Sequence, residues 1–442
     1  MRKRRARLAR SFGKQPHAAR RYLPDWLRWC GMTLKFDISL RHLRAFLTVA
    51  ETGSIAAAAK ATSRAQSAIA RSLKEIETHL SIKLFDRTRS GMALTVYGKA
   101  LAVRASAAAK EFKLAREALS TGRAQSSSPV FDMLFSEQRL LIFITLAEKG
   151  HMQATAKACG VSQPAVSAAI GDLEGSLGFL LFLRTAKGML LTNEGEVLLF
   201  RTKRAFAELR NASFDIAALQ GHVIGKVVVG SHPLSRASIL PLAIARLHAL
   251  YPNLSITTEE GSSDELISGV RSGDFDFILN TQQPGQLPLD LTDEHLMRER
   301  LAIFVRSGHP LTSKDAITAD ALLQSNWVLP ARRTSTRELI DTAFKTLYGH
   351  APRCVVETSD LLVLRRLLLS SDLVTAMSPQ QLDLETNTGL VQPISFDLPT
   401  ADRVTLLIQR AGCSLSPGAS LLATAIREIA AELNAKSPQG SR

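Results

Sequence analysis

The chain contains one long internal repeat, and this repeat limits what its first half can fold into. Residues 43–101 align with residues 140–198 at a constant offset of 97 positions, without a gap and with roughly two dozen identities. The matched pairs include Phe46 with Phe143, Gly53 with Gly150, Gln66 with Gln163, Arg87 with Arg184, and Gly98 with Gly195. A repeat of this length indicates a tandem duplication, so the first half is expected to contain one structural unit built twice.

Each copy is predicted to begin with two helices separated by a tight turn. In the first copy, Leu43, Phe46 and Ala50 fall at helical spacing. Gly53 ends that helix, and Ser54 then offers an N-cap to a short, alanine-rich second helix.

A third helix, a hairpin and a long fourth helix follow in each copy. In the second copy, Ser162 is a good N-cap for the third helix. Residues 84–95 have apolar ends around a basic centre, which predicts a small hairpin, and Thr95 then caps a helix that ends near residue 119. The matching helix of the second copy is predicted over 193–219. Three helices with a basic hairpin form a winged helix-turn-helix.

A winged helix-turn-helix fits double-stranded DNA for physical reasons. Its third helix fits the major groove, the helix N-terminus favours phosphate, and Gln or Arg near that end can make paired hydrogen bonds to a base edge. Hairpin arginines hold neighbouring phosphates or enter the minor groove. The predicted DNA-binding residues lie at the starts of the third helices and on the hairpins: Arg64, Gln66, Ser67, Arg71, Arg87, Thr88, Arg89, Ser162, Gln163, Pro164, Ser167, Arg184 and Thr185.

These motifs resemble the DNA-binding head of LysR-type transcriptional regulators. The family pattern is Ser-Gln-Pro-Ala-x-Ser at the recognition helix, then Leu-Phe-x-Arg and Leu-Thr-x-x-Gly. The second copy has Ser162-Gln163-Pro164-Ala165-Val166-Ser167, Leu181-Phe182-Leu183-Arg184-Thr185 and Leu191-Thr192-Asn193-Glu194-Gly195. The resemblance extends over nearly the whole chain from about residue 40 and implies a ligand-responsive transcription factor. The family normally carries one such head per chain, whereas this chain has two copies.

The two copies depart from the family pattern in different ways. The first has Ala65-Gln66-Ser67-Ala68-Ile69-Ala70, so it loses the N-cap, the proline and the last serine, although it adds Arg64 and Arg71. Residues 32–123 hold 16 Lys and Arg against 7 Asp and Glu, whereas residues 124–221 hold 9 of each. We therefore hypothesise that the second head reads base sequence and the first mostly contacts phosphate. The alternative is that one head serves only as a spacer or a dimer surface.

The long fourth helices resemble the linker helices through which this family dimerises. Two such helices in one chain can pair with each other, or each can pair with its counterpart in a second chain. Self-association as a dimer or tetramer is expected from the resemblance, and RNA polymerase is a further candidate partner. Ser120–Ser128 is rich in Ser and Gly and predicts a flexible connection.

From Gly225 onward, short strands alternate with helices, which predicts an α/β region. Strands are expected at 227–229, 254–259 and 275–279, and a second group begins near Leu301. Val404–Ile408 and a helix near 420–433 are expected to return to the first group. This two-lobed pattern resembles the effector-binding domain of LysR regulators, which is itself similar to periplasmic binding proteins.

Ligands of such folds bind at the carboxyl ends of strands, between the lobes. The hydroxyl-bearing residues that fall there are Ser231, Ser235, Ser262, Ser263, Thr334, Ser335, Thr336, Thr358 and Ser359. Hydroxyl and amide donors suit a small anion or a polyol, and Arg332, Arg333 or Arg337 can add a carboxylate clamp. The alternative for each hydroxyl is a helix cap or a turn, and for Arg337 it is a solvated helix face.

The predicted division of the chain follows from these patterns. It consists of a basic arm at 1–35, the first head and linker helix at 36–122, a connection at 123–134, the second head and linker helix at 135–221, and an effector-binding domain at 222–436. Within that domain, lobe one is expected at about 223–298 and 400–436, and lobe two at about 299–399.

Other classes of protein find little support in the sequence. There is no His-Glu-x-x-His, no phosphate-binding Gly-Lys-Ser/Thr loop and no Gly-x-Ser-x-Gly elbow, so no enzyme, cofactor or metal is expected. A plain solute-binding protein is opposed by the two heads. The four cysteines are too far apart to suggest a zinc site or disulfide framework, and no apolar run is long enough to span a bilayer. A cytoplasmic, nucleoid-associated protein without membrane contact is expected.

The net charge of +15 is carried by the front of the chain. Residues 1–31 hold 10 Lys and Arg against 1 Asp, and they suggest an arm that grips phosphates. The alternative is that translation starts at Met32, close to the first head, in which case the arm does not exist.

Overall fold

The computed structural model describes residues 38–89, 91–120, 136–232, 237, 239–281, 287–313, 317–332, 334–396, 398 and 402–436. The basic arm, the choice between Met1 and Met32, the connection at 123–134, Ser235 and Arg333 lie outside these residues. The chain divides into two compact units. One contains mainly Arg116–Leu199, and the other joins His42–Ala115 to Phe200–Arg442.

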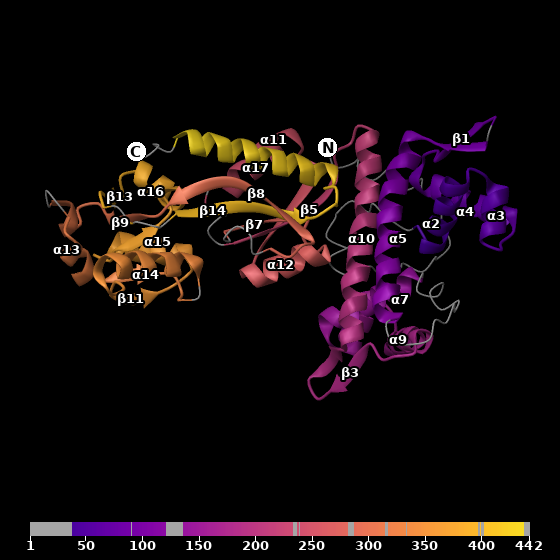
Figure 1. Cartoon of the computed structure of the whole chain (residues 1–442), viewed down its shortest axis with the longest axis horizontal. Helices are drawn as coiled ribbons and strands as arrows, with labels where there is room; N and C mark the ends of the chain where they lie inside the picture. Colours follow the sequence, from indigo (N-terminus) through magenta and orange to yellow (C-terminus); the bar gives the residue numbers. More distant parts are fainter. Residues whose placement is uncertain are drawn as a thin grey trace, which may run out of the picture. The chain divides into compact units, whose positions relative to one another are not determined.

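Both repeats have the predicted order of elements (Figure 1). The first repeat consists of α2 (Leu40–Thr52), α3 (Ile55–Ala61), α4 (Gln66–Leu80), β1 (Phe85–Thr88), β2 (Gly91–Leu94) and α5 (Val96–Ser120). The second consists of α7 (Glu137–Lys149), α8 (Met152–Cys159), α9 (Gln163–Leu177), β3 (Phe182–Thr185), β4 (Gly188–Leu191) and α10 (Asn193–Leu219).

The predicted caps of the first repeat are confirmed. The Ser54 side chain accepts from the Ala57 amide at the start of α3, and the Thr95 hydroxyl accepts from the Gly98 amide at the start of α5. In the second repeat Thr192 makes the same contact with Gly195.

The identities between the repeats are explained by the packing of the hairpin. Gly98 lies so close to the Leu84 carbonyl that a Cβ there would be 2.2 Å from its oxygen, and Gly195 has the same relation to Leu181 at 2.3 Å. Each hairpin is also held by the end of the first helix, because the Met92 amide donates to Gly53 and the Met189 amide donates to Gly150. The repeated residues therefore build the scaffold of each unit.

The C-terminal region begins with lobe one, a five-stranded sheet in the order β6-β5-β7-β14-β8. Its elements are β5 (Gly225–Ser231), α11 (Ile239–Leu250), β6 (Leu254–Glu260), α12 (Ser263–Ser272), β7 (Phe277–Asn280), β8 (Leu291–Arg300), β14 (Asp402–Arg410) and α17 (Pro417–Lys436). β5 is parallel to β6 and β7, and β14 is antiparallel to β7 and β8. The predicted return of the chain to the first lobe is thus confirmed, whereas β8 is absent from the sequence predictions.

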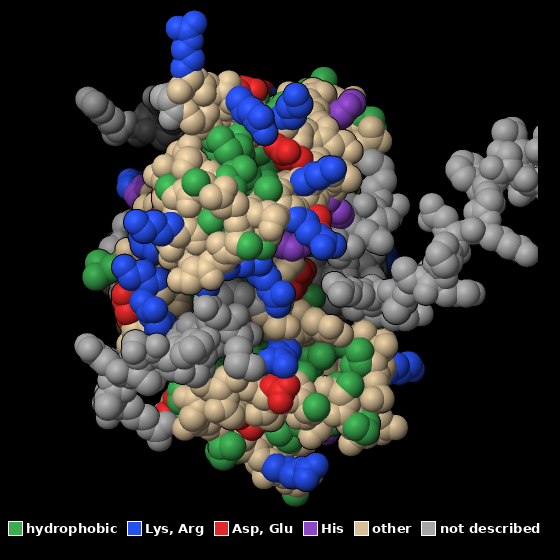
Figure 2. All heavy atoms as spheres, turned by 90° about the vertical axis from the view of Figure 1, so that its right-hand side faces the viewer, with side chains coloured by type: hydrophobic (Ala, Val, Ile, Leu, Met, Phe, Trp, Pro, Cys, Tyr) green, Lys and Arg blue, Asp and Glu red, His purple; other side chains and the backbone are tan. Residues whose placement is uncertain are grey.

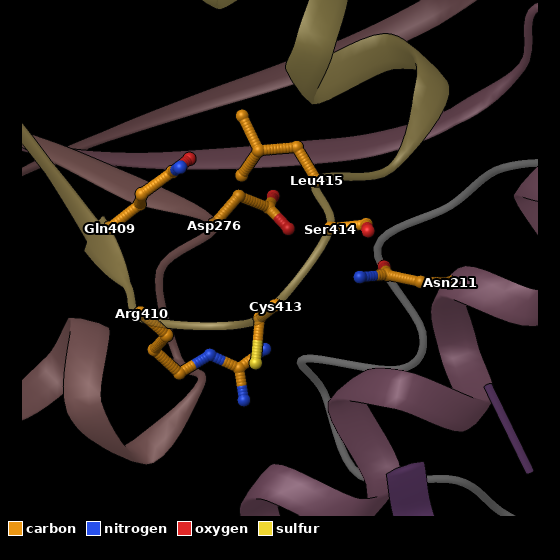
Figure 3. A pocket seen from close by; sticks show the side chains of 7 residues that line it. All are labelled: Asn211, Asp276, Gln409, Arg410, Cys413, Ser414 and Leu415. Atoms are coloured by element: carbon orange, nitrogen blue, oxygen red, sulfur yellow. The ribbon is translucent and has the colours of Figure 1, made fainter. Parts of the chain in front are cut away.

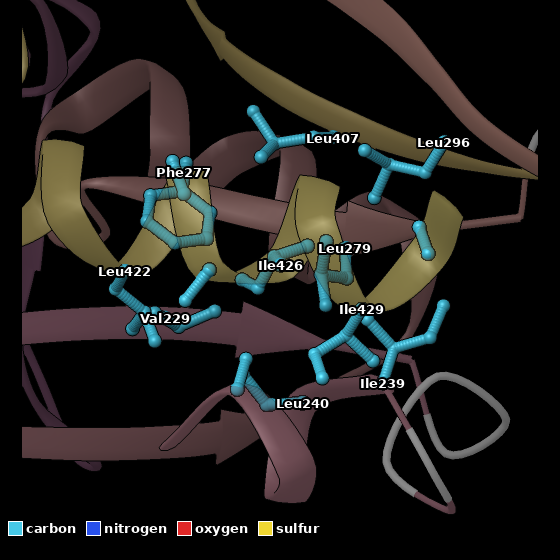
Figure 4. Close-up of a cluster of buried hydrophobic side chains, with 14 of the residues drawn as sticks. Val229, Ile239, Leu240, Phe277, Leu279, Leu296, Leu407, Leu422, Ile426 and Ile429 are labelled. Atoms are coloured by element: carbon cyan, nitrogen blue, oxygen red, sulfur yellow. The ribbon is translucent and has the colours of Figure 1, made fainter. Parts of the chain in front are cut away.

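Apolar side chains between this sheet and its helices form the main core of lobe one. Phe277, Leu279 and Leu407 from the sheet meet Leu422 and Ile426 of α17 (Figure 4).

Lobe two contains β9 (Ala302–Arg306), η2 (Pro310–Ser313), α13 (Ala319–Gln324), β10 (Trp327–Leu329), α14 (Ser335–Tyr348), β11 (Cys354–Glu357), α15 (Leu361–Ser370), β12 (Thr375–Met377), η3 (Pro379–Leu382), α16 (Asp383–Asn387) and β13 (Val391–Ile394). β9 lies between β12 and β13, and β10 pairs in parallel with β11. Trp327 is fully buried and packs edge-on against Phe344. None of the described helices has the length and apolar character needed to cross a membrane.

Candidate functional site

The third helix of each repeat buries one face and exposes its start. α4 buries Ile69, Leu73 and Ile76, and α9 buries Val166 and Ile170. The predicted DNA-binding residues are all exposed: Arg64, Gln66, Ser67, Arg71, Arg87, Thr88 and Arg89 in the first repeat, and Ser162, Gln163, Pro164, Ser167, Arg184 and Thr185 in the second. Each repeat therefore presents a polar helix start and a polar hairpin to solvent.

Several of these residues also have a structural role. The Ser162 side chain accepts from the Ala165 amide at 3.3 Å, whereas Ala65 gives α4 no side-chain cap, as predicted. The hydroxyls of Thr88 and Thr185 donate to carbonyls across their own hairpins. These hydroxyls therefore stabilise the local fold, and the glutamines and arginines beside them carry the candidate contacts.

A carboxylate on each third helix ties the helix to its hairpin. Glu77 accepts from the Leu84 amide at 2.8 Å, and Glu174 accepts from the Leu181 amide at 2.7 Å. Glu77 and Glu174 are not among the predicted site residues, although they match at the repeat offset of 97. They fix the position of the hairpin relative to the helix start.

The first repeat exposes several positively charged side chains near its third helix and hairpin. In the first repeat Arg64, Arg71, Arg87 and Arg89 are exposed, and Arg71 pairs with Glu75 at 3.0 Å. In the view of Figure 2, Lys and Arg side chains are more frequent than Asp and Glu side chains. Such a surface attracts a polyanion.

In lobe one, a polar group lies where two parallel strands end. Ser231 ends β5 opposite Leu279 of β7, and Asn280 and Thr281 follow directly. Ser231 Oγ, Asn280 Nδ2 and Thr281 Oγ1 are buried without a hydrogen-bond partner among the described residues. Buried polar atoms are normally satisfied, so this group suits a bound ligand or water.

The start of α12 lies beside this group. The Ser263 hydroxyl donates to Asn280 Oδ1 at 3.2 Å. Ser262 instead forms a capping box with Glu265, whose hydrogen bonds from the Ser262 backbone and side chain lower the pKa of Glu265. Asn280 and Thr281 are not among the predicted ligand-binding residues, although their position directly after a buried strand was the available signal.

In lobe two, most of the predicted hydroxyls have local partners. Thr334 caps α14 by accepting from the Arg337 amide, Ser359 accepts from the Ala331 amide, and Thr358 accepts from the Asp360 amide. Thr336 is buried and accepts from Arg403 at 3.4 Å, whereas Ser335 is exposed. The cap or turn interpretation therefore accounts for Thr334, Thr358 and Ser359.

Of the two interpretations that the sequence left open for Arg337, the solvated helix face is wrong. Its side chain is 4% exposed, donates to Asp341 at 2.9 Å and to the Pro330 carbonyl at 3.1 Å, and lies 3.8 Å from Glu357. These partners already occupy the guanidinium. Arg332 is exposed and lies 3.7 Å from Glu357.

The helix α10 contacts lobe one at the Ser272–Asp276 turn. Gly273 has a φ of +85°, and a Cβ there would be 3.0 Å from Ala207 of α10. Lys203 donates to Asp274 at 3.1 Å. Asp276 accepts from the Val228 amide at 2.8 Å, and burial raises its pKa against the opposing charge of Arg210.

A small polar pocket opens at this contact (Figure 3). It is lined by Asn211, Asp276, Gln409, Arg410, Cys413, Ser414 and Leu415. Among the described residues, no cluster of His, Cys, Asp and Glu is arranged to hold a metal ion.

Known proteins match this chain along most of its length. The LysR substrate binding domain matches residues 220–431, and the bacterial regulatory helix-turn-helix of the lysR family matches residues 40–99 and residues 138–196. The HTH-type transcriptional regulator GalR of Pseudomonas putida is 39% identical over 394 residues, which cover 89% of this chain and 98% of that protein.

Further matches are to regulators and to a solved structure of the same kind. A probable hydrogen peroxide-inducible genes activator of Streptomyces viridosporus is 28% identical over 67% of this chain and 94% of that protein. The solved structure of a full-length OxyR variant from Pseudomonas aeruginosa has a TM-score of 0.51 and 25% identity, and the match covers 66% of this chain and 97% of that chain. The chain therefore belongs to the LysR family of ligand-responsive, DNA-binding transcriptional regulators, and it is not an enzyme.

Proposed function

We propose that both repeats are DNA-binding heads and that the chain places two third helices on its target. The observation that carries the proposal is the exposed polar start of α4 and of α9, each on a complete scaffold. The helix-turn-helix match to both segments supports it, as does the GalR relative, whose match spans 89% of this chain.

The second repeat reads base sequence in this proposal. Gln163 is exposed at the first position of a capped helix, with Pro164 and Ser167 beside it. A capped N-terminus fixes the backbone from which Gln163 extends, and a fixed amide can pair with a base edge. Arg184 and Thr185 lie on the hairpin, where they contact the phosphate backbone.

The first repeat mainly contacts phosphate. Its third helix lacks a side-chain cap but is flanked by Arg64 and Arg71, and its hairpin adds Arg87 and Arg89. Gln66 and Ser67 are exposed at the helix start as well. Positive charge gives affinity for DNA, but without a rigidly held side chain that pairs with a base edge it gives little sequence preference.

Selection of binding sites from random DNA tests the proposal. The intact chain is compared with chains in which Gln163 and Arg184, or Arg64 and Arg87, are replaced by alanine. We expect the first pair of changes to abolish the selected consensus and the second to weaken binding to all sequences. If the Gln163 and Arg184 variant selects the same consensus, Gln163 does not read base sequence. If the Arg64 and Arg87 variant binds DNA with unchanged affinity, the first repeat is only a spacer.

The C-terminal region binds a small anion or a polyol in this proposal. The contacting residues are Ser231, Ser263, Asn280 and Thr281 of lobe one, with Ser335 and Thr336 as the candidates of lobe two, whereas Thr358 and Ser359 act as turn residues. Support comes from the three buried, unpartnered atoms at the ends of β5 and β7. Ser262 and Thr334 act as caps that fix the helix starts.

A screen of small carboxylates and polyols by thermal shift tests this part. A ligand that binds the folded chain raises its melting temperature, and the rise should be lost in Asn280→Ala. A rise that survives this substitution would place the ligand elsewhere. Self-association, contact with RNA polymerase and association with the nucleoid stay predictions of the resemblance.

A further inference from the structure

The helices α5 and α10 carry the same stripe of side chains. The offset of the repeat continues into these helices and matches Arg104 with Arg201, Ala108 with Ala205, Glu111 with Glu208, and Ala115 with Ala212. Members of the stripe are separated alternately by four and three residues, so they lie on one face of each helix. Most members are nearly fully buried, and the small alanines suit close packing of two helices.

The two helices form the same type of Arg–Glu ion pair twice, once in each direction. Arg104 of α5 donates to Glu208 of α10 at 2.8 Å, and Arg201 of α10 donates to Glu111 of α5 at 2.9 Å. Because the repeat matches Arg104 with Arg201 and Glu111 with Glu208, the second pair is the first with the helices exchanged. Such reciprocity is the property of a two-fold symmetric interface.

The pairing is antiparallel. Arg104 precedes Glu111 along α5, whereas its partner Glu208 follows Arg201, the partner of Glu111, along α10. Figure 1 shows the two helices side by side. An antiparallel pair related by a two-fold axis is one of the arrangements that two copies of one helix can adopt in a homodimer. Here both helices belong to one chain.

α10 adds two charges that α5 lacks. Arg104 also donates to Asp215 at 2.7 Å, and Glu111 also pairs with Arg204 at 2.9 Å. The matching positions of α5 are both alanine, Ala118 and Ala107. Two copies of α5 facing each other would therefore leave each buried arginine and glutamate with one partner fewer, which is costly for charges removed from water.

Lobe one completes the surroundings of Arg104. Its guanidinium donates to the carbonyls of Ser414 at 2.8 Å and Leu415 at 3.1 Å, and Arg410 donates to Glu208 at 3.0 Å. Burial lowers the pKa of Arg104, but its bonds with Asp215 and Glu208 outweigh that effect and hold the pKa above its ordinary value. Arg104 thus donates hydrogen bonds to acceptors on both α10 and lobe one.

We propose that α5 takes α10 of its own chain as its partner, so that a single chain contains the symmetric helix pair that two single-headed chains would have to form between them. The helices are joined through one repeat, and an intramolecular partner is present at an effective concentration in the mM range. The inference rests on helix contacts alone, so it stands or falls separately from the proposed contacts with DNA.

Crosslinking of the unmodified chain tests it directly. Unlabelled and ¹⁵N-labelled chains are unfolded, mixed in equal amounts and refolded together, and an amine-reactive crosslinker is added. Lys110 is one residue from Glu111 on α5, and Lys203 is two residues from Arg201 on α10, so both lysines flank the Arg201–Glu111 ion pair of 2.9 Å. We expect linked Lys110–Lys203 peptides to carry one isotope only. If the helices pair between chains, half of these peptides will carry both isotopes, and that result would overturn the proposal.

A cysteine pair provides a second measurement. Ala108→Cys and Ala205→Cys are combined in one chain in which Cys413 is replaced by serine, because Cys413 lines the pocket beside α10. Oxidation should give a disulfide-bonded monomer that migrates faster on a non-reducing gel. The matched control carries Ala109→Cys in place of Ala108→Cys, because Ala109 is exposed and lies off the stripe.

The same cysteines distinguish pairing within a chain from pairing between chains. When Ala108→Cys and Ala205→Cys are placed on separate chains of different size and refolded together, we expect no covalent dimer of unequal chains. A dimer of unequal chains would contradict the proposal. If the cysteine variants fail to fold, the isotope experiment on the unmodified chain decides alone.

Discussion

The two repeats use the same scaffold residues but present different surfaces. In the second repeat Ser162 caps α9 beside the exposed Gln163, whereas in the first Ala65 leaves α4 without a side-chain cap. The glycines and glutamates that hold the hairpin to the helices are the same in both. The comparison shows that packing constrains the buried positions of both copies, while the exposed positions are free to take on separate roles.

The largest expected difference concerns one matched pair of arginines on the linker helices. Arg104→Ala removes a side chain that is 3% exposed and leaves Glu208 and Asp215 without it, which we expect to cost about 3–5 kcal/mol in free energy of unfolding. Arg201→Ala should cost about 1 kcal/mol or less, because its side chain is 26% exposed and Glu111 keeps Arg204. Urea unfolding of both variants measures the difference. Equal losses of unfolding free energy in the two variants would show that burial by lobe one does not make Arg104 more important than Arg201.

The next largest effect concerns base reading. Gln163→Ala should reduce discrimination between a selected site and a mismatched site by about 1–3 kcal/mol, because a paired contact to one base is lost. Gln66→Ala, the matched change in the first repeat, should weaken binding to both sites alike. Competition binding with the two DNAs measures both. Equal loss of discrimination in the two variants would mean that both repeats read sequence.

A smaller effect is expected from exchange of the helix caps. Ser162→Ala should lower the stability of the chain by about 1 kcal/mol, and Ala65→Ser should raise it by a similar amount. Ala65 already has the extended backbone of a cap residue, with a φ of −65° and a ψ of 142°. Thermal unfolding measures the changes, with Ala70→Ser on the exposed face of α4 as the control. No gain in Ala65→Ser would indicate that another group already satisfies the start of α4.

The smallest effect concerns the salt dependence of binding. Arg64→Ala and Arg71→Ala should each reduce the slope of log affinity against log salt concentration by about 1, because each removes one phosphate contact. Arg246→Ala in lobe one serves as the control, since Arg246 is paired with Glu428 and Glu432 on α17. Titrations at several salt concentrations provide the slopes. Unchanged slopes would remove the first repeat from the phosphate contacts.

Much of the fold was predictable because its signals are local. Apolar spacing, Gly53 and the caps at Ser54, Ser162 and Thr95 define helices by interactions within a few residues. β8 was missed because most of its residues are polar and its buried positions do not alternate regularly, and because its partner, β14, lies more than a hundred positions away. Its pairing depends on contacts that no local pattern contains.

The candidate sites were predictable to different extents. The proposed DNA-binding residues lie exposed at helix starts and on hairpins, so the motif alone was enough to propose them. Arg337 was misjudged because its partners Asp341, Pro330 and Glu357 meet only when α14 packs beside β10 and β11. Asn280 and Thr281 were missed because their lack of partners is a property of the packed strand ends.

The sequence by itself determined that one unit occurs twice, where its helices begin, and which side chains each third helix presents. These properties depend on spacing and on caps, which are short-range. The tertiary structure alone decided that α5 and α10 face each other and that Arg104 is enclosed by Glu208, Asp215 and the Ser414 carbonyl. The reason is physical: the same stripe of residues fits several partners, and the additional buried charges and lobe one determine which partner is satisfied.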